Sequence, residues 1–243
     1  MSSNRAIDLI REHAPTISAG ILTADLMFLH QELSLLNQTG IKIIHFDVMD
    51  GCFVPKMTVG PPFIKSIKTN FLKDVHLMIQ DPLEKVDDYI KAGADLITVH
   101  IESSKNIHLV LKKLATMRKH NSQRHFIRGI ALNPDTPVEA LEPVLDDVEM
   151  IVALAVNPRV KQMSFFKDIG SKCARIKDMI SASPRKILLC IDGGIKKENI
   201  AEIAKIGADL VVSGSAIFDG QAVKENAKFM LNSLKSGSKS GIK

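Results

Sequence analysis

The chain alternates short runs of β-branched and aliphatic residues with longer segments of helical periodicity, and this alternation constrains its fold more than any other feature. Such alternation is typical of parallel βαβ units, in which each helix covers the sheet that the flanking strands form. We predict eight strands from these runs. They span residues 16–21, 42–47, 74–78, 96–100, 127–132, 150–155, 186–191 and 210–213.

The segments between the predicted strands have the features of helices that pack on a sheet. Leucines such as Leu29 and Leu33 recur at helical spacing, so one face of each segment is apolar. Gly40, Gly93 and Gly207 each stand directly before a strand, and glycine is the preferred residue just after a helix. The last two are each followed by Ala-Asp-Leu, which repeats one unit of the pattern.

Right-handed crossovers can close eight strands into a barrel or leave them as an open, doubly wound sheet, and the pattern is compatible with both. The strand count favours the barrel, and about 250 residues is typical of that fold. The chain has 243 residues, of which 45% are hydrophobic. We therefore predict one α/β domain, a (β/α)8 TIM barrel over residues 16–234. A short amphipathic segment, 1–15, precedes it, and a flexible basic tail, 235–243, follows.

The composition limits the expected partners. Lysine and arginine number 32 against 27 aspartates and glutamates, a net charge of +5 that suits an anionic substrate. The basic residues are scattered and the chain has no tryptophan and one tyrosine, so we expect no nucleic-acid partner. Three cysteines are too few for a disulfide framework, and no apolar run approaches the ~20 residues that span a bilayer. We expect a cytoplasmic protein with no membrane partner.

Polar side chains gather where the predicted strands end, which is the catalytic end of such barrels. His45 and Asp47 end the second strand and share one face, about 6.6 Å apart, because side chains alternate along a strand. Apolar Ile44, Phe46 and Val48 take the other face of that strand. His76 lies in the third strand and Asp192 ends the seventh.

Two imidazoles and two carboxylates that point into one barrel mouth are suitable ligands for a divalent metal. Zinc or ferrous iron is expected, and manganese and cobalt are further candidates. A histidine in a strand is more often a core or rim residue, and an aspartate after a strand often caps the next helix. We assign those structural roles to His13, His30, His108, His120 and His125, and to Asp95 and Asp209 as helix caps.

Glycines follow the seventh and eighth strands, at Gly193-Gly194 and at Gly214-Ser215. Glycine lets the backbone approach a phosphate closely, and the loops after these two strands commonly form the phosphate site of such barrels together with a helix N-terminus. Either pair alone is equally compatible with a simple turn. The occurrence of both after consecutive strands favours a phosphate site.

Several motifs occur in one order along the chain, and together they resemble the ribulose-phosphate 3-epimerase family between about residues 17 and 219. The first is the segment His-Phe-Asp-Val-Met-Asp-Gly at 45–51, with Phe-Val-Pro at 53–55. The others are Val-His-Leu-Met at 75–78, Gly-Ala-Asp at 93–95, Thr-Val-His at 98–100, Ala-Leu-Asn-Pro-Asp-Thr-Pro at 131–137, Val-Asn-Pro at 156–158, Ile-Asp-Gly-Gly-Ile at 191–195 and Gly-Ser-Ala-Ile-Phe at 214–218.

The resemblance implies a role for each matched residue. His45, Asp47, His76 and Asp192 would bind the metal, and Asp47 and Asp192 would also be the proton-transfer pair. Met49 and Met78 match methionines that line the family's site, although a methionine inside a barrel is more often simple packing. The resemblance also implies a phosphorylated ketose as substrate and a homo-oligomer.

The chemistry of inversion agrees with this set of residues. Inverting a carbon next to a ketone requires removal of its proton from one face and return of a proton to the other, so two acid/base groups are needed. A metal that polarises the ketone oxygen stabilises the ene-diolate between the two transfers.

The chain departs from the family at three places, which makes it a divergent member. Gly20 stands where the family usually has a serine, and Leu154 stands where it has a third methionine. Residues 159–163 replace a loop of the form Gly-Phe-Gly-Gly-Gln. In this loop, Arg159 and Lys161 either offer charge to the phosphate in place of backbone donors or form a solvated surface pair.

We expect a metal-dependent epimerase that inverts C3 of a ketose phosphate, D-ribulose 5-phosphate to D-xylulose 5-phosphate, in the pentose phosphate pathway of carbohydrate metabolism. Two alternatives stay open. One is a sister epimerase acting on a ketohexose phosphate such as allulose 6-phosphate. The other is a catalytically weakened barrel that binds sugar phosphates.

Overall fold

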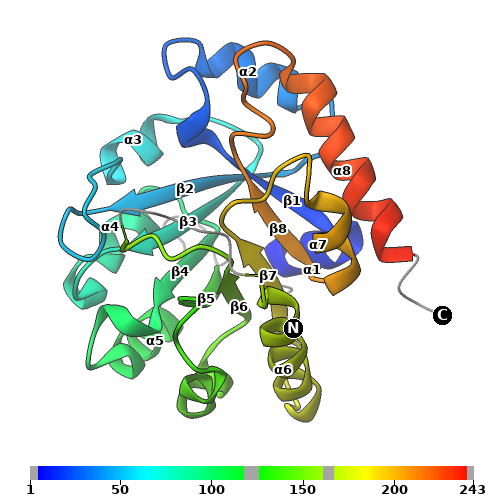
Figure 1. The fold of residues 1–243 in the computed structure, drawn as a ribbon. Coiled ribbons are helices and arrows are strands. Elements are labelled where there is room, and N and C mark those ends of the chain that lie inside the picture. The colour runs from blue at the N-terminus through cyan, green and yellow to red at the C-terminus, as the bar shows by residue number, and fades with distance from the viewer. Residues whose placement is uncertain (1–4, 118–125, 161–166, 240–243) are drawn as a thin grey trace.

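A computed structural model describes residues 5–117, 126–160 and 167–239 of the chain. In this part of the chain, eight parallel strands close into a barrel in sequence order, as Figure 1 shows. The (β/α)8 barrel predicted from the sequence is therefore confirmed. The strands are β1 (Thr16–Gly20), β2 (Ile43–Met49), β3 (Leu72–Met78), β4 (Leu96–His100), β5 (Ile127–Leu132), β6 (Met150–Leu154), β7 (Leu188–Asp192) and β8 (Leu210–Ser213).

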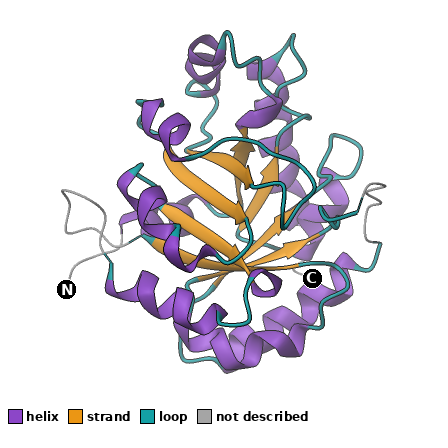
Figure 2. Cartoon of the chain, turned by 90° about the vertical axis from the view of Figure 1, so that its left-hand side faces the viewer, coloured by secondary structure: helices purple, strands orange, loops and turns teal. Residues whose placement is uncertain are grey.

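Helices surround the strands on the outside of the barrel (Figure 2). The α-helices are α1 (Arg5–His13), α2 (Leu29–Leu36), α3 (Pro61–Ser66), α4 (Val86–Lys91), α5 (Ile107–Thr116), α6 (Ile169–Ala182), α7 (Ile200–Ile206) and α8 (Val223–Lys239). Short 3-10 helices η1 (Ile21–Thr23), η2 (Pro82–Glu84) and η3 (Ile101–Ser103) follow β1, β3 and β4. A longer one, η4 (Val138–Asp147), joins β5 to β6.

The two faces of each strand enter different apolar layers, as β2 illustrates. Ile44, Phe46 and Val48 point outward and pack with the surrounding helices, as predicted. Ile43 points inward and packs with Ile10 of α1, so this helix closes the amino-terminal end of the barrel. The interior is apolar at this end, and the polar residues of the same inward faces lie toward the carboxyl ends of the strands.

Asp95 and Asp209 do not cap helices, so that prediction is wrong. Each directly precedes a strand and accepts a hydrogen bond from the backbone of the neighbouring strand. Asp95 Oδ2 lies 2.9 Å from the amide nitrogen of Lys73, and Asp209 Oδ2 lies 2.8 Å from that of Leu189. At the start of a strand the nearest free N–H belongs to the adjacent strand, which explains why these carboxylates join strands.

The carboxyl-terminal region is ordered further than the sequence suggested, since α8 continues to Lys239 and includes residues 235–239 of the predicted tail. Leu234 is fully buried, and a Cβ added at Gly237 would lie 2.6 Å from Cβ of Ala204 in α7. The glycine therefore allows close packing of α8 on α7, and this packing extends the helix. None of the helices in the described part of the chain has the length and apolar character that a membrane crossing requires.

Candidate metal and catalytic centre

The four polar residues predicted at the strand ends meet in the barrel mouth. β2 carries His45 and Asp47, β3 carries His76, and β7 ends at Asp192. Asp47 and His76 are direct partners in the parallel pairing of β2 with β3. Each of the four residues offers one ligand atom, and these atoms all lie within 4.8 Å of one another. The side chains of His45 and His76 are buried, whereas that of Asp47 is 30% exposed toward the mouth.

One ring nitrogen of each histidine faces both carboxylates. His45 Nε2 lies 3.3 Å from Asp47 Oδ1 and 3.8 Å from Asp192 Oδ2. His76 Nδ1 lies 3.1 Å from Asp192 Oδ2 and 3.8 Å from Asp47 Oδ1. Two imidazole nitrogens and two carboxylate oxygens therefore surround one centre, and this donor set suits zinc or ferrous iron.

The remaining ring nitrogen of each histidine also has a partner, which fixes the orientation of the ring. His45 Nδ1 lies 2.8 Å from Asp74 Oδ2, an oxygen that also accepts a hydrogen bond from Ser18 Oγ at 2.8 Å. His76 Nε2 lies 2.9 Å from Nε2 of His100. Partners of this kind are typical of metal-ligating histidines, because they determine which nitrogen is free to bind the metal.

Sequence reasoning missed Asp74 and His100, and also Glu102, whose Oε2 lies 3.0 Å from Nδ1 of His100. The signal was present, because Asp74 precedes His76 by two residues and so shares its face of β3, while His100 ends β4 at the catalytic end. Applying the strand-end rule to all eight strands would have found His100. Glu102 lies beyond the strand, in η3, and only its position in space reveals its contact with His100.

Opposite charges determine the electrostatics of the centre. Burial would lower the pKa of His45, but the negative charges of Asp74 and Asp47 outweigh it, so this pKa lies well above the ordinary value for histidine. Burial would raise the pKa of Asp47, but the attraction and hydrogen bond of His45 lower it. The centre therefore favours an ionised Asp47 beside a positive charge, and a divalent cation bound there would supply such a charge.

His100 and Glu102, which lie behind His76, differ in charge from His45 and Asp47: here the imidazole is neutral. Burial lowers the pKa of His100 to about 4, and Glu102 offsets this only in part. Burial would raise the pKa of Glu102, but hydrogen bonds from His100, Thr136 and the backbone of Asn133 lower it to about 2. At neutral pH a neutral imidazole therefore donates to an ionised carboxylate.

The two predicted lining methionines lie beside this centre. Met78 packs with Phe53 and Val54 in a small apolar cluster, and Met49 packs against that cluster from a partly exposed position. The Phe53 ring centre lies 4.9 Å from that of His100. The cluster therefore covers one wall of the mouth, next to the buried histidine.

The positions after β7 and β8 that hold glycine could not easily hold a residue with a side chain. Gly193 and Gly194 have φ values of 100° and 68°, in the region that side chains disfavour. A Cβ added at Gly193 would lie 2.4 Å from Cγ2 of Val156, and one at Gly214 would lie 2.9 Å from the carbonyl oxygen of Gly20. The two loops thus pack closely against their neighbours, while Ser215 is exposed.

Of the two cations predicted to reach the phosphate, only Arg159 falls within the described residues, and Lys161 lies outside them. The Arg159 guanidinium carbon lies 5.1 Å from the ring centre of Phe53, within the range of a cation–π contact. Asn157 Oδ1 accepts a hydrogen bond from the backbone of Arg159 at 3.0 Å. Arg159 therefore extends from the loop after β6 to the aromatic wall that follows β2.

The closed parallel barrel, with a cluster of two histidines and two aspartates at its catalytic end, defines a TIM-barrel protein with a candidate divalent-metal centre. The sequence model of the ribulose-phosphate 3 epimerase family matches residues 16–218. The chain belongs to this family, and it is therefore an epimerase that acts on carbohydrates.

Curated relatives agree with this membership over most of the chain. The ribulose-phosphate 3-epimerase of Bacillus subtilis is 34% identical over 214 residues, covering 87% of this chain and 95% of the relative. That of Escherichia coli K12 is 37% identical over 206 residues, covering 84% and 88%. The chloroplastic ribulose-5-phosphate-3-epimerase of Arabidopsis thaliana is 33% identical over 230 residues, covering 94% and 80%.

Solved structures of low sequence identity share the fold. The tryptophan synthase subunit alpha of Legionella pneumophila superimposes with a TM-score of 0.64 at 14% identity, covering 96% of this chain and 99% of that one. The 3-hexulose-6-phosphate synthase of Salmonella typhimurium superimposes with a TM-score of 0.63 at 14% identity, covering 91% and 99%. At this level of identity, the likeness concerns the barrel alone.

Proposed function

We propose that this protein is a ribulose-phosphate 3-epimerase that interconverts D-ribulose 5-phosphate and D-xylulose 5-phosphate by inverting C3, with the help of one divalent metal ion. The observation that carries the proposal is the convergence of His45, Asp47, His76 and Asp192 within 4.8 Å. Relatives with the same named activity, at about 35% identity, support the choice of substrate. The family resemblance also supports a homo-oligomer, which sedimentation analysis tests.

The metal would be held by His45 Nε2, His76 Nδ1 and one oxygen each of Asp47 and Asp192, since these atoms face the common centre. Zinc and ferrous iron fit this donor set, and manganese and cobalt are further candidates. When bound, the ion would polarise the ketone oxygen of the substrate and stabilise the negative charge that develops there.

The proton transfers are assigned to the two aspartates. Asp47 comes from β2 and Asp192 from β7, with β8 and β1 between them in the closed barrel, so the two carboxylates reach the centre from different directions. One carboxylate takes the C3 proton, and the electron pair moves to the C2 carbonyl to give an ene-diolate. The other, as a carboxylic acid, returns a proton to the opposite face of C3.

The phosphate is assigned to the loops after β7 and β8, through the backbone of Gly193, Gly194, Gly214 and Ser215. Backbone N–H groups of such loops bind anions without a charged side chain. Arg159 and Lys161 would add positive charge from the loop after β6. The position of Arg159 over Phe53 supports this role, because it keeps a cation at the wall of the mouth.

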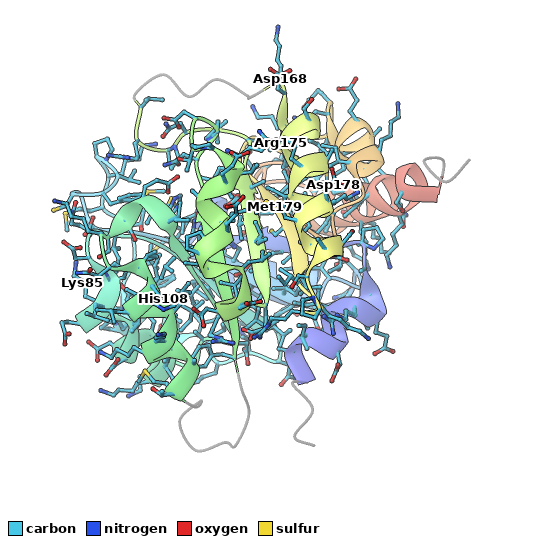
Figure 3. The ribbon with its side chains drawn as sticks, turned by 90° about the horizontal axis from the view of Figure 1, so that it is seen from below. Lys85, His108, Asp168, Arg175, Asp178 and Met179 are labelled. Atoms are coloured by element: carbon cyan, nitrogen blue, oxygen red, sulfur yellow. The ribbon has the colours of Figure 1, made fainter. Side chains whose placement is uncertain are left out.

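The test of the reaction is epimerisation in heavy water by the parent protein and by Asp47→Asn and Asp192→Asn. The parent should place deuterium at C3 of the product. Each substitution should lower kcat by at least about 10²- to 10⁴-fold, because it removes a positioned acid or base. Asp178→Asn is the matched control, since Asp178 is exposed on the outer helix α6 (Figure 3), and it should keep the parent rate. Near-parent turnover by Asp192→Asn would refute the assignment.

The substrate is tested separately, because the loop at 159–163 replaces the family's glycine-rich sequence. Turnover of D-ribulose 5-phosphate should exceed that of D-allulose 6-phosphate under the same metal. A preference for the hexulose phosphate would establish the sister epimerase instead. Binding of both ketoses without turnover by the metal-loaded protein would establish a weakened, sugar-phosphate-binding barrel.

A further inference from the structure

A chain of hydrogen bonds leads from His76 away from the metal centre, and the proposed reaction uses none of its other members. His100 is the first of them and is fully buried. Its Nε2 lies 2.9 Å from Nε2 of His76, and the two ring planes are nearly parallel, at 9°. This separation is shorter than the ~3.5 Å of stacked rings, so the rings meet edge to edge, as a hydrogen bond between ring nitrogens requires.

The next link determines the direction of this hydrogen bond. His100 Nδ1 lies 3.0 Å from Glu102 Oε2, and a carboxylate can only accept, so the proton is on Nδ1. A neutral imidazole that donates from Nδ1 has an acceptor at Nε2. His76 must therefore donate from its own Nε2, so that Nδ1 is its ring nitrogen available to a metal ion. That nitrogen faces Asp47 and Asp192 in the candidate metal centre.

Glu102 is itself held in place by the loop after β5. Its Oε1 accepts hydrogen bonds from the backbone N–H of Asn133, at 2.8 Å, and from the hydroxyl of Thr136. Lys172 of α6 fixes that loop from the other side, since its ammonium donates to the carbonyls of Asn133, Pro134 and Thr136. These contacts give a structural role to the Asn-Pro-Asp-Thr motif at 133–136, which lies far in the sequence from His76.

We infer that His100 and Glu102 are positioning residues for the metal centre: they set the tautomer and ring orientation of His76, and the 133–136 loop holds Glu102 in place. The inference rests on the proposed role of His76 as a metal ligand. His45 is oriented more simply, by direct contact with Asp74. The two imidazoles of the centre therefore depend on different supports, and the support of His76 extends through β4 to the loop after β5.

The first measurement is the zinc affinity of the metal-free protein, by competition with a chelator of known affinity. His100→Phe keeps a flat ring but removes the acceptor, and it should weaken zinc binding by about 10- to 100-fold. His100→Gln retains an amide oxygen that can accept from His76, so its affinity should lie between those of the parent and His100→Phe. Glu102→Gln should also weaken zinc binding.

Thr98→Val is the matched control. Thr98 is buried on the same strand, pairs with His76 across β3 and β4, and its hydroxyl has no hydrogen-bond partner among the described residues. This substitution should leave zinc affinity within about twofold of the parent. Parent-like affinity in a folded His100→Phe protein would overturn the inference.

The second measurement is the ¹⁵N NMR spectrum of the histidine rings in the metal-free parent protein, which needs neither turnover nor a variant that folds. The inference predicts that His76 carries a proton on Nε2 and that His100 carries its proton on Nδ1 and none on Nε2. A proton on His100 Nε2, which would reverse the hydrogen bond between the two rings, would overturn it. If the parent protein binds no zinc, the metal role in the proposed function fails, while this spectrum still decides the hydrogen-bond direction.

Discussion

Removal of the proposed divalent metal should lower the melting temperature of the protein while leaving the barrel folded at 25 °C. The candidate ligands come from β2, β3 and β7, and β7 lies on the far side of β8 and β1 from β2 in the closed barrel. Unfolding separates these strands, so the unfolded chain has no preformed site. An ion that binds only the folded state stabilises it by mass action.

The size of the effect follows from the free metal concentration. At a free zinc concentration 100 times the dissociation constant, the folded state gains about 2.7 kcal/mol. For a chain of this length, each kcal/mol shifts the melting temperature by roughly 2–4 °C. The expected difference between the zinc-loaded and the chelated protein is therefore about 5–11 °C.

The assay is thermal unfolding by circular dichroism with zinc and with chelator, alongside turnover. Chelated protein should be inactive but keep the parent spectrum at 25 °C. His45→Gln should lose most of the zinc-dependent shift. His108→Gln should keep it, since His108 lies half exposed on the outer helix α5 (Figure 3). Equal melting temperatures with zinc and chelator, or an equal shift in His45→Gln, would contradict a metal site at these residues.

Three further predictions concern residues around the centre. Gly193→Ala should raise KM for the sugar phosphate, because the φ of 100° is strained for alanine and the new methyl group would meet Val156; an unchanged KM would remove this loop from the phosphate site. Lys172→Met should lower the free energy of unfolding measured in urea by about 1–3 kcal/mol, since the buried carbonyl of Asn133 loses its donor while water can reach the part-buried carbonyls of Pro134 and Thr136; a parent-like midpoint would argue against the role of Lys172 in holding this loop. Of the three cysteines, only exposed Cys52 should react with a thiol reagent in the folded protein, and all three should react after denaturation; rapid labelling of a second thiol in the folded state would contradict the burial of the other two.

Most of the local architecture was predictable from the sequence. The predicted strands agree with the observed ones within a few residues, because β-branched runs and glycines after helices report backbone preferences that act over short distances. His45, Asp47, His76 and Asp192 were identified because strand alternation and the position of strand ends are also local properties. The expectation that their side chains converge followed from the barrel, and the structure brings them together.

Other features depend on contacts between distant parts of the chain. Asp95 and Asp209 were predicted to cap helices, but they bond to neighbouring strands. The helix α8 extends into the predicted tail because Gly237 packs against Ala204, 33 residues earlier, and the periodicity of the tail gave no sign of this contact.

The sequence by itself determined which residues form strands and which polar side chains end them, since backbone preference and alternation act over a few residues. The strand count favoured a barrel over an open sheet, but closure itself is decided by the tertiary structure, because it depends on the pairing of β1 with β8 across the whole chain. The tertiary structure also decided which residues support the candidate metal ligand His76. His100 is 24 residues from His76 in the sequence, and Thr136 is 34 residues from Glu102. Hydrogen bonds at such separations depend on strand register, which no local pattern records.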